Sequence, residues 1–267
     1  MENREVVISV RDLEKTLGGL KVLDGISLDI YKGETFVIMG GSGCGKTTFL
    51  RHLIGALKPD KGHIYYANKD ITSLTSAEID NFRRKFGMVF QSAALLDSLN
   101  VEDNVALPLK EHTKLDDNII KIIVKMKLAL VGLRGFENLM TSELSGGMKK
   151  RVGLARAIAM DPELVFYDEP SSGLDPIVTA VIDDLILDLS KKLLITSIVV
   201  SHDMNSVFRI ADRVAMLHKG KILQIGTRDE IKNSSNPIVQ QFIQGKTEGP
   251  VDFFKKGDDY LTELVDK

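Results

Sequence analysis

Apolar and polar residues follow two different patterns near the start of this chain. Positions 26–30 alternate apolar and polar side chains, which is typical of a half-buried strand, and a turn is expected at positions 32–34. Positions 35–39 (TFVIM) do not alternate and favour a strand that is buried on both faces of a parallel sheet. A short strand is also predicted at positions 6–10, with a turn at Gly18-Gly19.

Similar buried-strand runs recur later, separated by stretches with helical character. They lie at residues 87–90, 164–167, 195–200 and 214–217. This alternation predicts an α/β core. Residues 92–160 contain no convincing core strand but include an amphipathic stretch at 116–131 and a helix after Gly147, so we interpret them as a mostly helical insertion. After Gly226 the chain has first helical and then polar character.

These patterns divide the chain into three parts. Residues 1–91 and 161–240 are expected to form the core, and residues 92–160 the helical subdomain. Residues 241–267 are expected to form a C-terminal tail, which is rich in glycine at its start and carries more apolar side chains than a free tail usually does. We favour docking of this tail on a partner over a tail that is disordered in solution.

Composition narrows the classes of protein that fit. With 267 residues and a formal net charge of -2, the chain lacks the positive charge of a nucleic-acid binder or a polybasic membrane clamp, so no nucleic-acid partner is expected. Cys44 is the one cysteine, which fits a reducing compartment. No apolar run approaches the roughly 20 residues that span a bilayer. We therefore expect a cytosolic chain that reaches a membrane only through a partner.

A glycine-rich segment carries the strongest chemical signal. Residues 40–47 (GGSGCGKT) match the pattern G-x-x-x-x-G-K-[ST] and lie between a predicted strand and a helix that runs to about Leu57. Glycines let backbone N–H groups surround phosphate oxygens, Lys46 reaches the β- and γ-phosphates, and the Thr47 hydroxyl is a ligand for Mg²⁺. A chance glycine-rich turn before a helix is the competing interpretation. The predicted nucleotide-binding residues are Gly40, Gly41, Ser42, Gly43, Cys44, Gly45, Lys46, Thr47 and Thr48.

Two carboxylates follow one of the buried-strand runs. Asp168 and Glu169 end the run LVFY and should lie at the carboxyl edge of the sheet, beside the glycine-rich loop. There Asp168 would hold Mg²⁺, and Glu169 would polarise the water that attacks the γ-phosphate. A strand that ends in Asp-Glu is otherwise often just a solvated strand end. The upstream phosphate loop favours the catalytic interpretation.

A second anion-binding pattern lies in residues 144–148 (LSGGM), where Ser145, Gly146 and Gly147 precede a basic helix. One nucleotide does not need two such sites from one chain. Two chains arranged head to tail would use one site from each. This pattern therefore predicts a dimer with shared ATP sites.

Together these motifs resemble the ATPase subunits of ABC transporters over nearly the whole chain. The resemblance implies a P-loop NTPase (RecA-like) core with an N-terminal antiparallel β subdomain and an inserted α-helical subdomain. It also implies ATP and Mg²⁺ as cofactors and ATP hydrolysis as the activity. Lys46, Glu169, Gln91 and His202 would be catalytic; Thr47, Gln91 and Asp168 would hold the metal; and Asp175 would relay across the dimer. Without the resemblance, Gln91 is an ordinary strand-end residue and His202 an ordinary loop histidine.

Within that family, several segments look like the ATPases of Mla/Mce-type lipid transporters. They are residues 104–113, residues 142–148 with Met148 in place of the usual Gln, and the tail around Phe242, 249–251 and 259–260. The resemblance implies a transmembrane permease, an Mce-domain lipid-binding protein, an accessory subunit and a place on the cytoplasmic face of the inner membrane. A drug or lipoprotein exporter, a soluble ABC ATPase of repair or translation, and a P-loop small-molecule kinase are the competing interpretations.

Two positions depart from the family pattern or leave alternatives open. Leu17 stands where most of these ATPases stack adenine on an aromatic ring, so we expect weak base stacking and modest base selectivity. Cys44 lies where a helix N-terminus can activate a thiol, although a small residue in a tight loop explains it as well. The stretch 116–131 is interpreted as core packing rather than as a lipid site.

Overall fold

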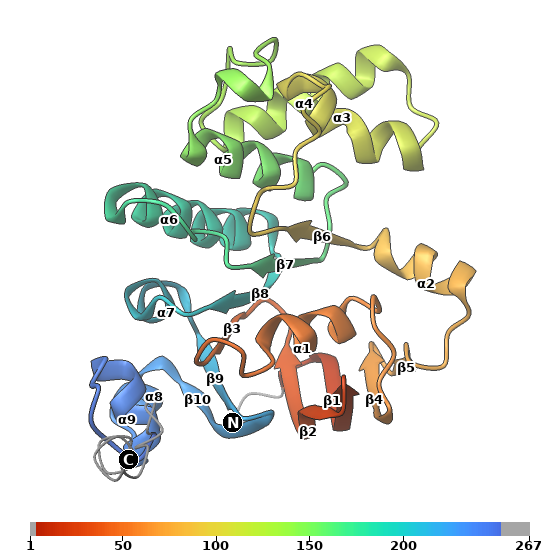
Figure 1. The fold of residues 1–267 in the computed structure, drawn as a ribbon. Coiled ribbons are helices and arrows are strands. Elements are labelled where there is room, and N and C mark those ends of the chain that lie inside the picture. The colour runs from red at the N-terminus through yellow and green to blue at the C-terminus, as the bar shows by residue number, and fades with distance from the viewer. Residues whose placement is uncertain (1–3, 252–267) are drawn as a thin grey trace, which may run out of the picture.

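The computed structural model describes residues 4–251 and contains two sheets and two groups of helices (Figure 1). The first sheet has the order β2-β1-β4-β5 and is antiparallel throughout. Its strands are β1 (Val6–Leu17), β2 (Leu20–Tyr31), β4 (Lys61–Tyr66) and β5 (Lys69–Asp70).

The strands predicted at residues 6–10 and 26–30 are parts of longer ones. The register of β1 against β2 shifts between Val10 and Leu13, where Asp12 has a φ of 47°. Such a bulge breaks the alternation of apolar and polar positions while the strand continues, so the sequence pattern ends early. The predicted turn at Gly18 and Gly19 connects the two strands, with φ values of 56° and 82°.

The second sheet forms the centre of the molecule and has the order β10-β9-β3-β8-β7-β6. Its strands are β3 (Thr35–Met39), β6 (Phe86–Val89), β7 (Leu164–Asp168), β8 (Thr196–Ser201), β9 (Arg213–His218) and β10 (Lys221–Thr227). All are parallel except β10, which pairs antiparallel with β9. Because parallel strands end at one edge, the residues after β3, β7 and β8 come together there.

Both faces of the central sheet are buried. Along β3, Val37 and Met39 belong to one apolar cluster, and Phe36 and Ile38 belong to the other. The first cluster also contains residues of all the α-helices that follow β6, and the second contains residues of the antiparallel sheet and of the helix after β3. This double burial explains why residues 35–39 show no alternation.

The helices next to the central sheet are α1 (Lys46–Leu53), α2 (Ser76–Arg83), α6 (Pro176–Leu193), α7 (Met204–Ile210), α8 (Arg228–Lys232) and α9 (Pro237–Gln244). α1 ends four residues before the predicted position. Ile54 is its C-terminal cap residue. Gly55 takes a left-handed φ of 66°, which ends the helix before Pro59 is reached.

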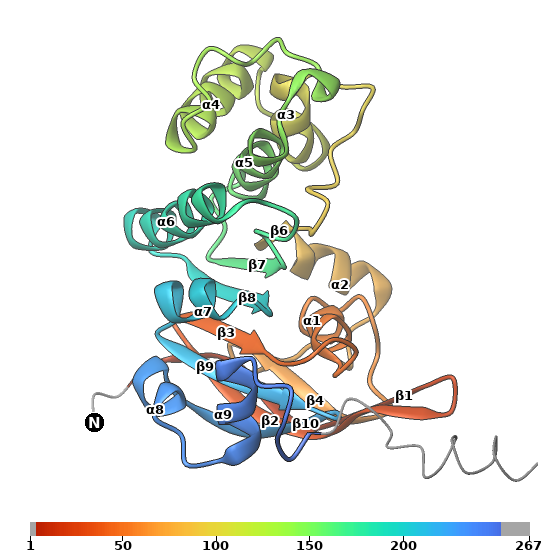
Figure 2. The same ribbon diagram turned by 60° about the vertical axis from the view of Figure 1, so that its left-hand side comes forward.

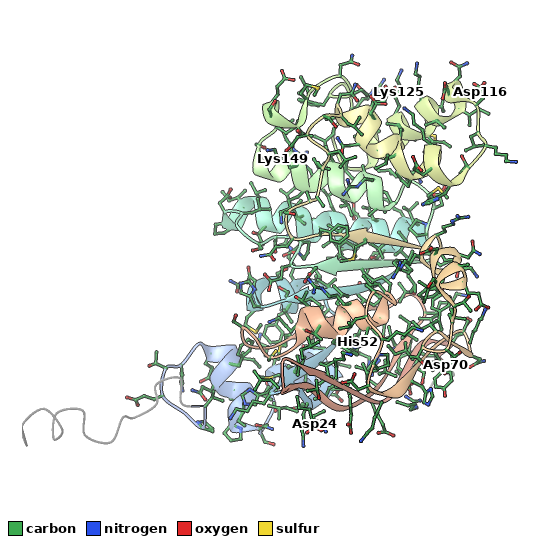
Figure 3. All side chains as sticks on the ribbon, turned by 45° about the vertical axis from the view of Figure 1, so that its right-hand side comes forward. Asp24, His52, Asp70, Asp116, Lys125 and Lys149 are labelled. Carbon is green, nitrogen blue, oxygen red and sulfur yellow. The ribbon has the colours of Figure 1, made fainter. Side chains whose placement is uncertain are left out.

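A separate helical layer lies above the sheet (Figures 1 and 2). It contains α3 (Val101–His112), α4 (Asp117–Leu130), the short 3-10 helix η1 (Thr141–Glu143) and α5 (Gly146–Ala157). Residues 92–160 hold no named strand, as predicted. Asp116 and Lys125 lie at the outer end of this layer, far from Asp24 of the antiparallel sheet (Figure 3). Within residues 4–251 we find no helix with the length and apolar character needed to cross a membrane.

Candidate functional site

The segment between β3 and α1 forms a tight loop that only glycine permits at two positions. Gly40 has a φ of 153°, and a Cβ atom there would lie 2.2 Å from the carbonyl oxygen of Leu217. Gly45 has a φ of 107°, and its Cβ would lie 2.9 Å from the carbonyl oxygen of Val22. Both the backbone conformation and the close approach of neighbouring backbone therefore exclude larger residues.

Lys46 points back into this loop. Its Nζ donates hydrogen bonds to the carbonyl oxygens of Gly40 (2.9 Å) and Gly41 (3.0 Å), and the residue is only 7% exposed. It also opens α1, whose first turn carries no acidic residue that would oppose an anion. The positive helix end and the buried ammonium together suit a polyphosphate.

A pocket of about 570 Å³ opens over the loop. It is lined by Val22, Gly40, Gly41, Ser42, Gly43, Gly45, Lys46, Thr47, Thr48, Glu169, His202 and Phe242. The fold thus brings nearly all of the predicted loop together with two predicted catalytic residues, Glu169 at the end of β7 and His202 at the end of β8. Val22 and Phe242 also line it, and sequence patterns gave no site signal for either position.

Asp168 and Thr47 form a pair at the edge of this pocket. The Thr47 hydroxyl donates to Oδ1 of Asp168 over 3.2 Å. Burial raises the pKa of the Asp168 carboxyl, opposed by the Thr47 hydrogen bond and by the charges of Arg51 and Lys46. A half-buried carboxylate beside a hydroxyl fits the hard oxygen ligands that Mg²⁺ prefers. Within residues 4–251 no group of three or more Asp, Glu, His or Cys residues is arranged to hold a metal ion by itself.

Glu169 and His202 are in direct contact. Nδ1 of His202 lies 3.0 Å from Oε1 of Glu169, and the Glu169 side chain is 19% exposed. Glu169 has a φ of 48°, and its N–H donates to the carbonyl of Val200 at 3.0 Å. A non-glycine residue in the left-handed region is strained, and such strain is concentrated at functional sites.

Gln91 lies outside the pocket wall. Its Nε2 donates to the hydroxyl of Ser172 over 3.1 Å, and its main-chain carbonyl accepts a hydrogen bond from Lys150. The side chain is therefore placed toward the segment after β7 rather than toward Thr47 in this structure. Its predicted metal contact stays a prediction.

The second glycine motif lies at the start of α5. Ser145 caps this helix by accepting a hydrogen bond from the N–H of Met148 at 3.3 Å. A Cβ added at Gly147 would lie 2.6 Å from Cγ1 of Val178, so Gly147 is packed tightly on α6. Asp175 caps α6 and accepts from the N–H groups of Ile177 and Val178, each at 3.0 Å.

The two anion-binding motifs of one chain are in different parts of the fold. α5 belongs to the upper helical layer, whereas α1 and the phosphate loop lie beside the central sheet below it (Figures 1 and 2). Ser145, Gly146 and Gly147 do not line the pocket over the phosphate loop. This separation is consistent with the expectation that a second chain supplies the motif.

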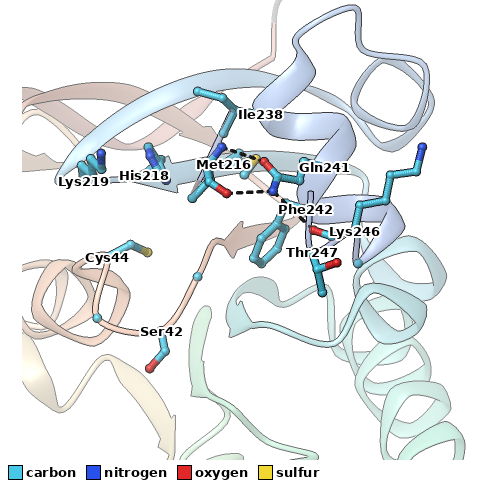
Figure 4. A pocket seen from close by; sticks show the side chains of 14 residues that line it. Ser42, Cys44, Met216, His218, Lys219, Ile238, Gln241, Phe242, Lys246 and Thr247 are labelled. Atoms are coloured by element: carbon cyan, nitrogen blue, oxygen red, sulfur yellow. Dashed lines mark hydrogen bonds between the residues drawn. The ribbon is translucent and has the colours of Figure 1, made fainter. Parts of the chain in front are cut away.

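A second cavity of about 510 Å³ lies between the loop and α9 (Figure 4). Cys44 and Phe242 contribute to its wall. Gln241 holds the following segment in place, because its side chain accepts from the N–H of Val251 (2.8 Å) and donates to the Val251 carbonyl (2.9 Å). The predicted docking of the tail concerns mainly residues 252–267, which lie outside the described residues.

Two further predictions concern single residues. Burial raises the pKa of the Cys44 thiol, which favours the interpretation of a small loop residue over that of an activated nucleophile. Leu17 is 41% exposed at the end of β1 and is not part of the pocket wall. Its predicted contact with adenine stays a prediction.

Comparison with known proteins decides the family. The sequence pattern described as "ABC transporter" matches residues 23–172 of this chain. The intermembrane phospholipid transport system ATP-binding protein MlaF of Haemophilus influenzae is 45% identical over 260 residues, which cover 97% of this chain and 98% of that protein. The chain belongs to the ABC transporter family.

Other family members support this placement. MlaF of Escherichia coli is 42% identical and covers 97% of this chain and 96% of its own. The probable ribonucleotide transport ATP-binding protein mkl of Mycobacterium leprae is 41% identical over 95% of this chain and 73% of its own length.

Two solved structures of the family share the fold. A dimeric ATP-binding cassette in a post-hydrolysis state with ADP and Pi has a TM-score of 0.76 and 30% identity, covering 83% of this chain and 98% of its own. The protein cbiO1 of Clostridium perfringens, part of the ABC transporter complex cbiONQ, has a TM-score of 0.80 and 30% identity, covering 91% of this chain and 94% of its own. The predicted α/β fold is confirmed, and as an ABC cassette the chain is an ATPase that binds and hydrolyses ATP.

Proposed function

We propose that this ATPase energises phospholipid transport through a separate membrane permease, in a complex of the Mla/Mce type. The observation that carries the proposal is the 45% identity to MlaF over 97% of the chain. The relatives named mkl are described as ribonucleotide transporters, so substrate class is the point that needs testing.

The proposed catalytic unit is a head-to-tail homodimer. In each site Lys46 and the loop of one chain hold the phosphates of ATP, while Ser145, Gly146 and Gly147 of the other chain close on the γ-phosphate. Glu169 takes the proton of the attacking water, and His202 contacts the γ-phosphate and holds the Glu169 carboxylate, consistent with their 3.0 Å contact. Asp175 passes structural changes at one ATP site to the other chain.

Thr47 and Asp168, with Gln91, are the proposed ligands of Mg²⁺. When bound, this ion neutralises charge on the transferred phosphoryl group. The protein's own part is to hold a hydroxyl and a half-buried carboxylate 3.2 Å apart at the loop, where the positive end of α1 also lies. Residues 1–91 and 161–240 are the proposed core that carries these groups, with residues 92–160 as the helical subdomain and 241–267 as the tail.

The permease is proposed to dock at a groove between the core and the helical layer. This groove has a volume of about 590 Å³, and its wall combines apolar residues such as Phe86 and Leu107 with the cations Arg83, Arg84 and Arg156. A helix of the permease that presents apolar side chains and a carboxylate would match it. In the proposed complex the ATPase lies on the cytoplasmic face of the inner membrane, and an Mce-domain protein and an accessory subunit are further members.

Purification of the tagged chain from its native membranes tests this function. We expect a permease and an Mce-domain protein to co-purify, and the reconstituted complex to move labelled phospholipid between vesicles when ATP is present. The matched control is the Lys46→Ala complex, which should assemble but transfer no lipid. ATP-driven movement of ribonucleotide without phospholipid would contradict the proposal, as would a chain that assembles with no membrane protein.

A further inference from the structure

Lys150 is a buried lysine in the middle of α5. It is 7% exposed, and its side chain lines a small internal gap together with residues of β6, β7 and α6. That gap offers no space for a water molecule. Because a buried ammonium is costly unless it is hydrogen-bonded, the position of Lys150 calls for a functional reason.

The ammonium of Lys150 donates a hydrogen bond to the main-chain carbonyl of Gln91. Six residues further along α5, Arg156 donates to the carbonyls of Ala93 (2.7 Å) and Ala94 (2.8 Å). Two cations of one helix therefore bind three carbonyl oxygens of the segment that follows β6. We refer to residues 91–94 as the Gln91 loop.

The Gln91 loop has a backbone that needs such support. Ala93 and Ala94 have φ values of 61° and 47°, a left-handed conformation that L residues other than Asn and Asp rarely adopt. Strained segments of this kind persist only when their surroundings hold them. α5 also packs closely here, since a Cβ added at Gly153 would lie 3.3 Å from Cβ of Ala93.

From the loop the contacts continue toward the reaction centre. The Gln91 side chain donates to the hydroxyl of Ser172, and the N–H of Ser172 donates to the carbonyl of Glu169 at 3.1 Å. At its other end, α5 begins at the cap residue Ser145. One helix thus links the second anion-binding motif to the Gln91 loop and to the segment that follows the proposed catalytic base.

We propose that Lys150 is a positioning residue that fixes the Gln91 loop to α5, so that Gln91 and Ser145 move as one rigid body. The inference rests on the proposed roles of these two residues in hydrolysis. In the closed dimer Gln91 serves the ATP bound by its own chain and Ser145 serves the ATP bound by the partner. Lys150 therefore couples the two ATP sites through a single helix.

The Lys150→Met variant of the full-length chain tests this coupling. Methionine keeps the apolar contacts of the lysine stem but leaves the Gln91 carbonyl without its donor, so we expect a modest fall in the thermal midpoint, and ATPase rates are compared well below it. The Kd for ATP, measured with a fluorescent ATP analogue, should stay within about twofold of wild type, while kcat falls about tenfold or more and KM changes little. A purely structural residue would lower stability as well but leave the kcat of the folded fraction unchanged.

Lys127→Met is the matched control. Lys127 is buried to a similar degree, at 6% exposure, but it lies in α4 and pairs with Asp161 instead of the Gln91 loop. Its replacement should leave kcat within about twofold of wild type, because it removes a buried lysine without touching the proposed coupling. Equal losses of kcat in the two variants would overturn the proposal.

A double variant shows whether Lys150 acts through Gln91. If it does, Gln91→Ala combined with Lys150→Met should be no slower than the slower single variant, whereas independent effects would multiply. A slow Gln91→Ala variant beside a fully active Lys150→Met variant overturns the role of Lys150 alone. A fully active Gln91→Ala variant overturns the proposed role of Gln91 and, with it, the coupling.

Discussion

Nδ1 of His202 lies 3.0 Å from Oε1 of Glu169, so the ends of β8 and β7 share one hydrogen bond above the phosphate loop. The two residues are far apart in sequence and meet only because their strands are parallel neighbours in the central sheet. The contact fixes the direction of a carboxylate whose backbone is strained. It is the part of the site on which the proposed chemistry depends most.

Replacing His202 should therefore slow hydrolysis strongly. His202→Ala removes the partner that orients Glu169, and we expect kcat to fall by about 10²–10⁴ with little change in Kd for ATP. Steady-state ATPase assays measure this effect. Asn205→Ala, an exposed change on the helix that follows, is the control and should keep full activity. A His202→Ala variant with wild-type kcat would contradict the assigned role.

The two glycines after Ser145 should differ in their tolerance of alanine. A Cβ at Gly147 would lie 2.6 Å from the branched side chain of Val178, whereas a Cβ at Gly146 would meet Leu174 at an ordinary 3.5 Å. We expect Gly147→Ala to lower the free energy of unfolding by about 1–3 kcal/mol, and Gly146→Ala to change it by less than about 1 kcal/mol. Urea unfolding decides the matter, and an equal or larger loss for Gly146→Ala would contradict the packing described.

Asp183 should make stability depend on pH in a defined direction. This residue of α6 is 2% exposed and accepts a hydrogen bond from the Ser206 hydroxyl at 2.6 Å. Desolvation by burial raises the pKa of its carboxyl, and the charge of Asp203 adds to the effect. The folded chain therefore binds this proton more tightly than the unfolded chain, and burial of the ionised form costs stability once the pH is above the raised pKa.

Asp183→Asn keeps an acceptor for Ser206 and removes that cost. At pH 7.5 the variant should melt about 2–4 °C higher than wild type, which is the effect of about 1 kcal/mol in a domain of this size. The gain should shrink as the pH falls through the raised pKa, because wild-type Asp183 is then neutral as well. Thermal melts between pH 4.5 and 8 test this, and a gain that is constant across the range would refute the assignment.

The predicted modest selectivity for the nucleotide base can be tested at Leu17. Wild-type protein, which has no aromatic ring at this position, should hydrolyse GTP with a kcat/KM within about tenfold of that for ATP. Leu17→Tyr should improve kcat/KM for ATP by lowering KM, since it supplies a ring for adenine. A wild-type protein with a much stronger preference for ATP, unchanged in Leu17→Tyr, would show that Leu17 does not contact the base.

Sequence patterns predicted the elements whose signal is local. β3 was predicted with its observed bounds because residues 35–39 form an uninterrupted run that favours a strand and shows no helical periodicity. The ends of β1 and α1 were missed, because a bulge at Asp12 breaks the pattern of β1 while the strand continues, and a left-handed Gly55 ends α1 before Pro59 is reached. The short strands β4 and β5 and helix α2 were not predicted at all, because their segments mix glycine, charged and aromatic residues without a clear period.

The candidate site was predictable to a similar extent. The phosphate loop and Glu169 were found from motifs and His202 from the family resemblance, and the fold brings them into one pocket. Val22 and Phe242 were missed because they reach the pocket from β2 and α9 through tertiary packing alone. The hydrogen bonds from Lys150 and Arg156 to the Gln91 loop were also invisible, since they depend on how α5 lies against residues 91–94.

The mass of the Glu169→Gln protein in solution, measured by light scattering with and without ATP, tests the central claim that each chain holds half of a site. The substitution should prevent hydrolysis but keep ATP bound, so we predict twice the mass of one chain with ATP and a single chain's mass with ADP. Adding Ser145→Arg to the same chain should abolish the ATP-dependent dimer, because the second half of each site is then blocked. A Glu169→Gln protein that turns over ATP at the wild-type rate, or that binds ATP and stays monomeric, would contradict the account.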